Sequence, residues 1–204
     1  MIIRTKAFGA LKTNCYILEQ FTTSLIIDPG QGSGKWIQKT LSCQPLAILN
    51  THGHYDHVFD NSVVKNALLL PIYIHPDDAD LLINDDYKVG LQTSIPDVYF
   101  HDETEYELGP FRFKCIHLPG HTHGSTILDF GDYIFSGDFV MEKAVGRYNF
   151  HTSSKEKMFE SLKKYKEYFS SKNRNPNTVV YPGHGKAFPL KTSLDVVNKW
   201  LTFF

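Results

Sequence analysis

The feature that most constrains this chain is the hexapeptide His52-Gly53-His54-Tyr55-Asp56-His57, which places three imidazoles and a carboxylate within six residues. Histidine is costly to cluster, because neighbouring imidazolium ions repel each other and neutral rings need hydrogen-bond partners. Such clusters usually bind metal ions or transfer protons. Residues two apart on an extended backbone point the same way, so His52 and His54 can hold one ion, while Asp56 and His57 lie further on and can face a second. The hexapeptide therefore predicts a metal site.

Four apolar runs of the chain each end in a loop that contains glycine together with histidine or aspartate. These loops hold residues 52–57, His121, Asp138 and His184. Loops that leave one edge of a sheet converge, so we expect one shared site built on rigid strands. Adding His121 to the first pair of ligands, His184 to the second and Asp138 between them gives each of two ions three or four nitrogen and oxygen ligands. This is an open, catalytic type of site with room for a bridging water.

The coarse pattern of the chain predicts a layered α/β sandwich in a single domain, residues 1–204, because β-type runs and amphipathic helical stripes are mixed along it. A capping box of Ser153 and Glu156 begins the clearest helix, which runs to Phe169. A terminal helix is expected from about Ser193. The other expected helices cover 35–41 and the residues from His75 to Ile83. The expected strands are 14–18, 24–27, 46–49, 71–74, 111–115, 133–135 and 178–181.

Composition excludes several classes of protein. The 204 residues carry 21 Lys and Arg against 22 Asp and Glu, so no overall field attracts nucleic acid or an anionic membrane surface. The longest apolar run, 67–74, is far shorter than the roughly 20 residues of a membrane span. The first residues do not resemble a signal peptide, so a cytoplasmic location is expected. The three cysteines have no pairing pattern, which disfavours a disulfide framework or a thiolate metal site. The oligomeric state is left open.

Four segments together resemble the successive motifs of the metallo-β-lactamase superfamily, in order and over nearly the whole chain. They are His52-x-His54-x-Asp56-His57, Leu118-Pro119-Gly120-His121-Thr122-His123-Gly124-Ser125, Ser136-Gly137-Asp138 and Tyr181-Pro182-Gly183-His184-Gly185. The resemblance implies a four-layered αββα sandwich with the metals at one edge. Because an aspartate, Asp138, stands in place of a metal-binding cysteine and the chain is short, it resembles the glyoxalase II-like hydrolases of this superfamily.

The same resemblance implies the ligand set. One metal would be held by His52, His54 and His121 and the other by Asp56, His57 and His184, with Asp138 shared. Zinc is the first choice for both ions, with iron or manganese as alternatives, because an all-nitrogen-and-oxygen set does not discriminate sharply among them.

Three further residues are expected to contact substrate. His123 stands where family members usually have proline, and Arg147 and Tyr148 lie in a segment where glyoxalase-like members often carry Gly-Arg-Ser/Thr-Asp-Phe.

The expected activity is hydrolysis by a metal-bound hydroxide, since metal binding can lower the pKa of water to about 7. Asp56 and Asp138 would hold the hydroxide and the ions in line. The motifs supply no separate general acid, so the leaving group must depart unaided, which a thiolate with a pKa of about 8.5 does more easily than an amine. A small-molecule thioester such as a hydroxyacyl-glutathione is therefore the expected substrate.

Other functions remain open at this point. A lactonase or another ester hydrolase uses the same site, an iron-dependent persulfide dioxygenase keeps the same histidine motif with one iron, and a regulatory metal-binding domain would turn over no acyl substrate. A glycine-rich stretch, residues 30–36, lacks the residue types that a phosphate-binding loop requires at its two ends. His75, His101 and His151 are expected at the surface or at helix caps. His117 is expected either to support a ligand or to contact substrate.

Overall fold

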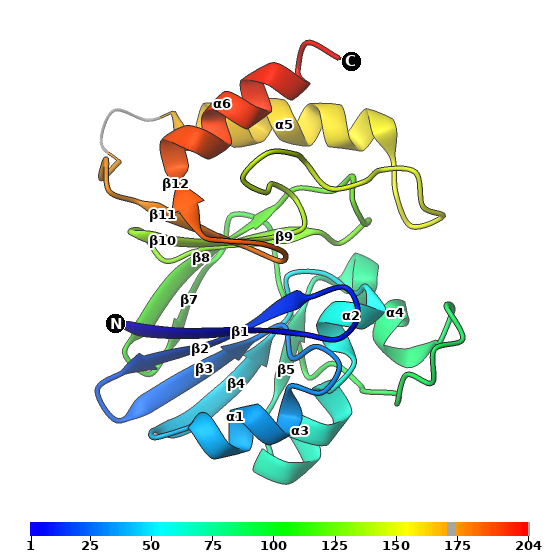
Figure 1. Cartoon of the computed structure of the whole chain (residues 1–204), viewed down its shortest axis with the longest axis vertical. Coiled ribbons are helices and arrows are strands. Elements are labelled where there is room, and N and C mark those ends of the chain that lie inside the picture. The colour runs from blue at the N-terminus through cyan, green and yellow to red at the C-terminus, as the bar shows by residue number, and fades with distance from the viewer. Residues whose placement is uncertain (171–173, 204) are drawn as a thin grey trace.

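The computed structural model describes residues 1–170 and 174–203, which form four layers (Figure 1). Two six-stranded sheets face each other, and helices cover the outer face of each sheet. The first sheet is covered by α1 (Gly34–Thr40) and α3 (Asn61–Leu68), and the second by α5 (Lys155–Phe169) and α6 (Leu190–Trp200). The predicted αββα sandwich is confirmed.

The first sheet has the strand order β1-β2-β3-β4-β5-β6. Its first three strands form an antiparallel meander, and the pairs from β3 to β6 are parallel. The carboxyl ends of β3, β4 and β5 therefore meet at the same edge, where the loops after them can share a site. The strand bounds are Ile2–Phe8, Thr13–Gln20, Thr23–Ile27, Gln44–Leu49, Ile72–Ile74 and Val98–Tyr99.

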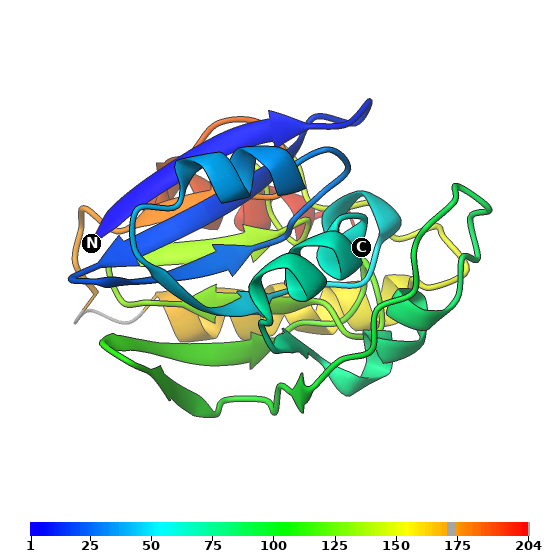
Figure 2. The same ribbon diagram turned by 90° about the horizontal axis from the view of Figure 1, so that it is seen from below.

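The second sheet has the order β12-β11-β10-β9-β8-β7. Its pairs are antiparallel except for β10 with β11, which run parallel. The strand bounds, from β7 to β12, are Glu105–Leu108, Phe111–His117, Thr126–Asp129, Tyr133–Gly137, Val179–Pro182 and Phe188–Pro189. Seen from below, the second sheet and its helices lie behind the first sheet (Figure 2).

The apolar core is divided among the three spaces between layers. Strand β2 shows why, because side chains alternate between the faces of a strand. Cys15 and Ile17 pack in the cluster with α1 and α3, whereas Tyr16 and Leu18 pack in the cluster between the two sheets. A third cluster lies between the second sheet and α5 and α6. Both faces of the central strands are covered, so β2 is almost entirely buried.

The helix starts differ from the sequence prediction in two places. Helix α5 is capped by Ser154, whose Oγ accepts a hydrogen bond of 3.2 Å from the amide of Lys157. Ser153 is not the cap, because its hydroxyl donates to the carbonyl of His121 at 2.6 Å. Helix α6 begins at Leu190, three residues before the expected start. The expected helix after His75 is a short 3₁₀ turn, η1 (Pro76–Asp78), followed by α4 (Ala79–Ile83).

No helix within residues 1–170 and 174–203 combines the length and the apolar character that crossing a membrane requires.

Candidate metal centre

The seven side chains predicted to bind metal converge at one edge of the sandwich, although they come from four separate loops. Asp56 and His57 lie on the short helix α2 (Tyr55–Val58), and His54 immediately precedes it. The loops after β4, β8, β10 and β11 contribute, in chain order, His52, His54, Asp56, His57, His121, Asp138 and His184.

His52, His54 and His121 form the first group. Their ring centroids are 4.8 Å apart for His52 and His54, 4.9 Å for His52 and His121, and 4.5 Å for His54 and His121. The ring planes cross at 71° to 87°. One nitrogen of each ring lies within 4.8 Å of the other two. Three imidazoles arranged in this way can direct their lone pairs at one cation.

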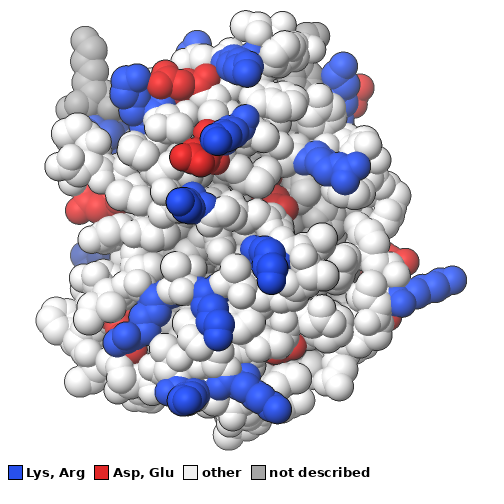
Figure 3. All heavy atoms as spheres, viewed as in Figure 1, with Lys and Arg blue, Asp and Glu red and all other residues white. Residues whose placement is uncertain are grey.

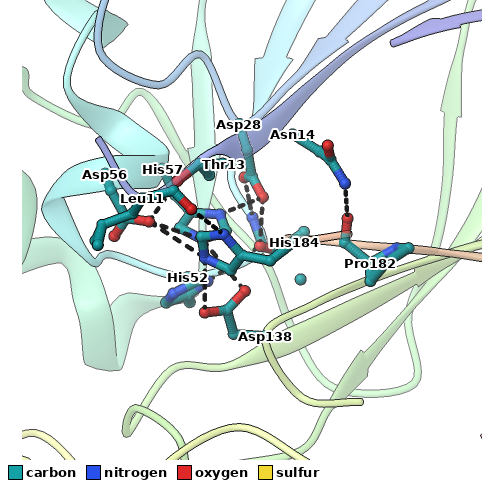
Figure 4. Close-up of polar contacts among 12 residues, drawn as sticks. Leu11, Thr13, Asn14, Asp28, His52, Asp56, His57, Asp138, Pro182 and His184 are labelled. Atoms are coloured by element: carbon teal, nitrogen blue, oxygen red, sulfur yellow. Dashed lines mark hydrogen bonds and ion pairs between the residues drawn. The ribbon is translucent and has the colours of Figure 1, made fainter. Parts of the chain in front are cut away.

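Asp56, His57 and His184 form the second group, and Asp138 lies beside them (Figure 4). Oδ2 of Asp56 is 3.5 Å from Nε2 of His57 and 3.4 Å from Nε2 of His184. Asp138 places Oδ1 3.3 Å from Nε2 of His57, and Oδ2 3.5 Å from Nε2 of His121 and 3.3 Å from Nε2 of His184. A single carboxylate therefore reaches both groups.

Each of the five imidazoles uses its other ring nitrogen in a hydrogen bond that fixes the ring. His121 Nδ1 donates to the carbonyl of Arg147 at 2.7 Å, and His184 Nδ1 donates to that of Leu11 at 3.0 Å. The remaining partners are the hydroxyl of Thr51 for His52 at 3.1 Å, that of Thr152 for His54 at 3.2 Å, and the carboxylate of Asp28 for His57 at 2.9 Å. Outer hydrogen bonds of this kind set the tautomer and orientation of metal-binding histidines.

Four polar atoms at the centre of the site are buried without a hydrogen-bond partner. They are Nε2 of His52, His57 and His121, and Oδ1 of Asp138. Buried polar atoms without partners are rare in proteins because each costs roughly 1–3 kcal/mol, so each calls for an explanation. These atoms face one another, and imidazole nitrogen and carboxylate oxygen are ligands for divalent transition metals. The residues present therefore fit two such ions.

The electrostatics differ between the two groups. Burial and the neighbouring imidazoles hold the pKa of His52 well below its usual value, and burial together with His121 lowers the pKa of His54 to about 3. These rings are neutral near pH 7 and keep free lone pairs. Burial acts in the same direction on His184, but hydrogen bonds to Asp138 and Asp56 outweigh it and raise its pKa to about 9. A cation in the second group therefore replaces a proton.

The carboxylates are held in the ionised form that metal ligation requires. Burial opposes the charge of Asp138, but His57 and His184 outweigh burial and keep its pKa well below the usual value. The pKa of Asp56 is lowered in the same way, by His57 and by hydrogen bonds from His184 and from Thr13, whose Oγ1 donates to Oδ2 at 2.5 Å.

Two buried aspartates that support the site were not singled out by sequence reasoning. Asp28 lies just after β3, and besides His57 it accepts hydrogen bonds from the amide of Thr51 at 2.8 Å and its hydroxyl at 2.6 Å. Asp78 ends η1 and accepts from the amides of Gly53 at 2.8 Å and Gly124 at 2.6 Å. Asp78 thus ties the first histidine loop to the loop of His121. The turn residues after β3 were visible in the sequence, but no local pattern marks either carboxylate as a partner of a distant loop.

Gly53 allows the close packing of the first histidine loop. A Cβ at this position would lie 2.7 Å from Cβ of Leu81 and 2.9 Å from the carbonyl oxygen of Asp78. A larger residue would therefore push the loop, with His52 and His54, away from α4.

A cavity of 470 Å³ opens onto the metal centre. Arg147, a predicted substrate contact, lines it, and its guanidinium lies 5.2 Å from the ring centroid of Phe150. Tyr148 and His123, the other two predicted contacts, are not among the described residues that line it: the Tyr148 ring lies 6.5 Å from that of Trp200, and the His123 carbonyl accepts a hydrogen bond from His117. The lining residues are Leu11, His54, Tyr55, Asp56, Tyr87, His121, Asp138, Met141, Gly146, Arg147, Phe150 and His184.

Comparison with known proteins agrees with this geometry. The family model of the metallo-beta-lactamase superfamily matches residues 8–184. The probable metallo-hydrolase YqgX of Bacillus subtilis is 29% identical over 204 residues, which cover 94% of each chain. A crystal structure of the BLEG-1 B3 metallo-beta-lactamase is 26% identical, with a TM-score of 0.86, and covers 98% of this chain and 100% of that one. A crystal structure of TTHA1623 in a di-iron-bound form is 33% identical, with a TM-score of 0.79 and coverage of 95% and 98%.

The chain therefore belongs to the metallo-beta-lactamase superfamily. Its fold, its clustered histidines and aspartates and its relatives make it a metallo-hydrolase of that superfamily.

Proposed function

We propose that this chain is a thioesterase that hydrolyses a hydroxyacyl-glutathione or a related thioester with two divalent metal ions. One ion would be held by His52, His54 and His121, and the other by Asp56, His57 and His184, with Asp138 shared. Bound ions of this kind supply a hydroxide nucleophile at neutral pH and a positive charge for the developing oxyanion. The position of Asp138, within 3.5 Å of imidazoles from both groups, is the observation that carries the proposal.

The rest of the cavity favours a thioester. Its lining residues include no carboxylate besides Asp56 and Asp138 and no imidazole besides the ligands, and none of them is lysine, cysteine or serine. Apart from the phenols of Tyr55 and Tyr87, whose pKa values are raised by burial, the described lining thus offers neither a nucleophilic side chain nor a separate acid to protonate an amine. A thiolate, with a pKa of about 8.5, departs without such help.

The chain's own residues would position the reacting groups. Asp56 is fixed by Thr13 and Asp138 by its contacts with three imidazoles, so the two carboxylates hold their charge at the point of attack. Arg147 is exposed at the cavity and can pair with a carboxylate of the substrate.

Zinc is the first choice of metal, with iron and manganese as alternatives. The donor set is entirely nitrogen and oxygen, which these three metals share. TTHA1623, a similar protein, was crystallised in a di-iron-bound form, which supports iron as the principal alternative.

The test combines metal analysis with a substrate screen. The purified protein should contain about two ions per chain and should hydrolyse lactoyl-glutathione or another thioester faster than a lactone or a chromogenic cephalosporin. A chelator should abolish the activity, and zinc, iron or manganese should restore it. A single tightly held iron, oxygen uptake with glutathione persulfide and no thioester hydrolysis would overturn the proposal in favour of a dioxygenase.

A further inference from the structure

Positive and negative side chains are segregated along this nearly neutral chain. Residues 1–42 and 183–203 carry eight Lys and Arg against three acidic residues, whereas residues 76–107 carry ten acidic residues and one lysine. The basic segments include β1, α1 and α6, and in the view of Figure 3 Lys and Arg outnumber Asp and Glu. The acidic segment includes β6 and β7, at the other edges of the two sheets. Several acids of the acidic segment are paired with cations from other elements, as Asp97 is with Lys65 and Asp102 with Lys164, so the charge difference between the two sides depends mainly on the basic segments.

Two of the basic residues lie within two positions of residues that line the cavity. Lys12 follows Leu11, which lines the cavity, and Lys186 lies two residues after His184, which also lines it. The two turns are joined, because His184 Nδ1 donates to the carbonyl of Leu11 at 3.0 Å and Asn14 Nδ2 donates to that of Gly185 at 2.9 Å. Lys12 and Lys186 therefore lie on adjoining turns beside the metal centre, and both are exposed.

Neither lysine is neutralised by the protein. Both are exposed, and no ion pair joins either to an acid within residues 1–170 and 174–203. By contrast, two of the three acids of the basic segments are paired: the buried Glu19 with Arg4 at 2.9 Å and the exposed Asp195 with Lys191 at 3.0 Å. Leu11 is 52% exposed next to Lys12, so the rim offers an apolar surface together with its positive charge.

We propose that the thiol half of the substrate is a phosphorylated polyanion of the coenzyme A type. It lies over these two turns with its phosphates at Lys12 and Lys186. This inference rests on the proposed thioesterase function. Lysine ammonium groups bind phosphate as point charges. Glutathione fits less well because it carries less negative charge and has no phosphate, and its free ammonium group would find no carboxylate partner outside the metal groups. The carboxylates among the described lining residues, Asp56 and Asp138, are both in the metal groups.

The kinetic test compares three thioesters that carry the same acyl group on coenzyme A, on glutathione and on N-acetylcysteamine, using the metal-loaded protein. The coenzyme A thioester should have a kcat/KM at least about tenfold above that of the N-acetylcysteamine thioester, and added salt should reduce the difference. In the double variant Lys12→Glu/Lys186→Glu, kcat/KM for the coenzyme A thioester should fall about tenfold or more, with the neutral thioester unaffected. Lys166→Glu, at an exposed position on α5, is the matched control and should change neither value.

A binding measurement keeps this inference separate from the activity. Adenosine 3′,5′-bisphosphate, which has neither thiol nor acyl group, should bind the wild-type protein about tenfold more tightly than the double variant in titration calorimetry. If this difference is found and no thioester is hydrolysed, the thioesterase proposal fails and the anion site stands. If the bisphosphate binds both proteins equally, or if the three thioesters are hydrolysed without regard to charge, the inference is overturned.

Discussion

Two clusters of histidine lie in the described part of the chain, and they have different geometries. In the metal centre, the rings of His52, His54 and His121 are 4.5–4.9 Å apart and nearly perpendicular. At the ends of β5 and β8, His75 and His117 are stacked, with centroids 3.8 Å apart and planes only 15° from parallel. Asp77 lies beside them, so this second cluster also has three groups that could hold a metal.

The difference shows what separates a metal ligand from a clustered histidine. Zinc lies about 2.0–2.1 Å from an imidazole nitrogen, along its lone pair, so several rings bind one ion only when their lone pairs converge. Crossed rings allow this, whereas stacked rings keep their lone pairs side by side.

One ring nitrogen of each histidine in the stack is engaged in a local hydrogen bond. His117 Nε2 donates to the carbonyl of His123 at 2.8 Å, and His75 Nδ1 accepts from the amide of Asp77 at 3.3 Å, which caps η1. Among the described residues, the buried histidine nitrogens without partners all belong to the metal centre. The stack therefore joins the two sheets and is not expected to bind an ion.

The largest expected effect separates the two clusters directly. His121→Ala removes a ligand nitrogen that has no other partner, so we expect the metal content to fall by about one ion per chain and hydrolysis to fall at least about a thousandfold, or roughly 4 kcal/mol. His117→Ala, four residues away, should keep both ions and its activity within about twofold. Metal analysis and steady-state kinetics of the two variants measure this. An equal loss of metal in His117→Ala would contradict the distinction between the clusters.

A smaller effect is expected for Asp28, which holds a predicted metal ligand in place but is not itself a predicted ligand. Asp28→Asn keeps the shape of the side chain but removes the charge that holds Nδ1–H of His57, and changes at such partners typically weaken metal binding about 10–100-fold. Asp102→Asn is the matched control, because Asp102 accepts from the amide of His117 at 2.8 Å and supports the stack instead. Competition with a chromogenic chelator gives the affinities. Similar affinities in the Asp28 variant and the wild type would show that this carboxylate does not support its ligand.

The sequence predicted the layers and the convergence of the four loops because both depend on local signals. Each strand near the site is a short buried run followed by turn residues, as in 133–138 and 178–184, and such runs can be recognised without knowledge of distant partners. The resemblance to a known superfamily then supplied the order of the layers. The family model over residues 8–184 confirms that resemblance.

The supporting shell could not be predicted because its contacts are long-range. Asp78 is 46 residues from Gly124, and Asp28 is 29 residues from His57. A long-range contact also decides which serine caps α5. Ser153 matches the capping pattern, but its hydroxyl binds the carbonyl of His121, and Ser154 is the cap instead. Periodicity likewise did not indicate that Tyr148 would lie beside Trp200 instead of in the cavity.

The smallest expected effect concerns the response of the stack to protons. Burial and the adjacent His117 lower the pKa of His75 from its usual 6.5 to about 4, so the unfolded chain takes up this proton more readily than the folded protein. The stabilising contribution of neutral His75 is therefore complete above pH 6.5 and is lost as the pH falls towards 4. His75→Phe keeps a flat ring against His117 but cannot titrate.

Urea unfolding at pH 7 and pH 5 measures this contribution. When the pH is lowered from 7 to 5, the unfolding free energy of His75→Phe should fall by about 1 kcal/mol less than that of the wild type. This figure allows for partial solvent screening. The variant also loses the hydrogen bond by which His75 caps η1. This loss lowers the stability of the variant equally at both pH values and therefore cancels in the difference. His151→Phe, at a side chain that is 60% exposed, should leave the difference unchanged. If His75→Phe has the same pH dependence as the wild type, protonation of His75 is compensated within the stack, and Asp77 or Asp102, which favour its charged form, would be the groups responsible.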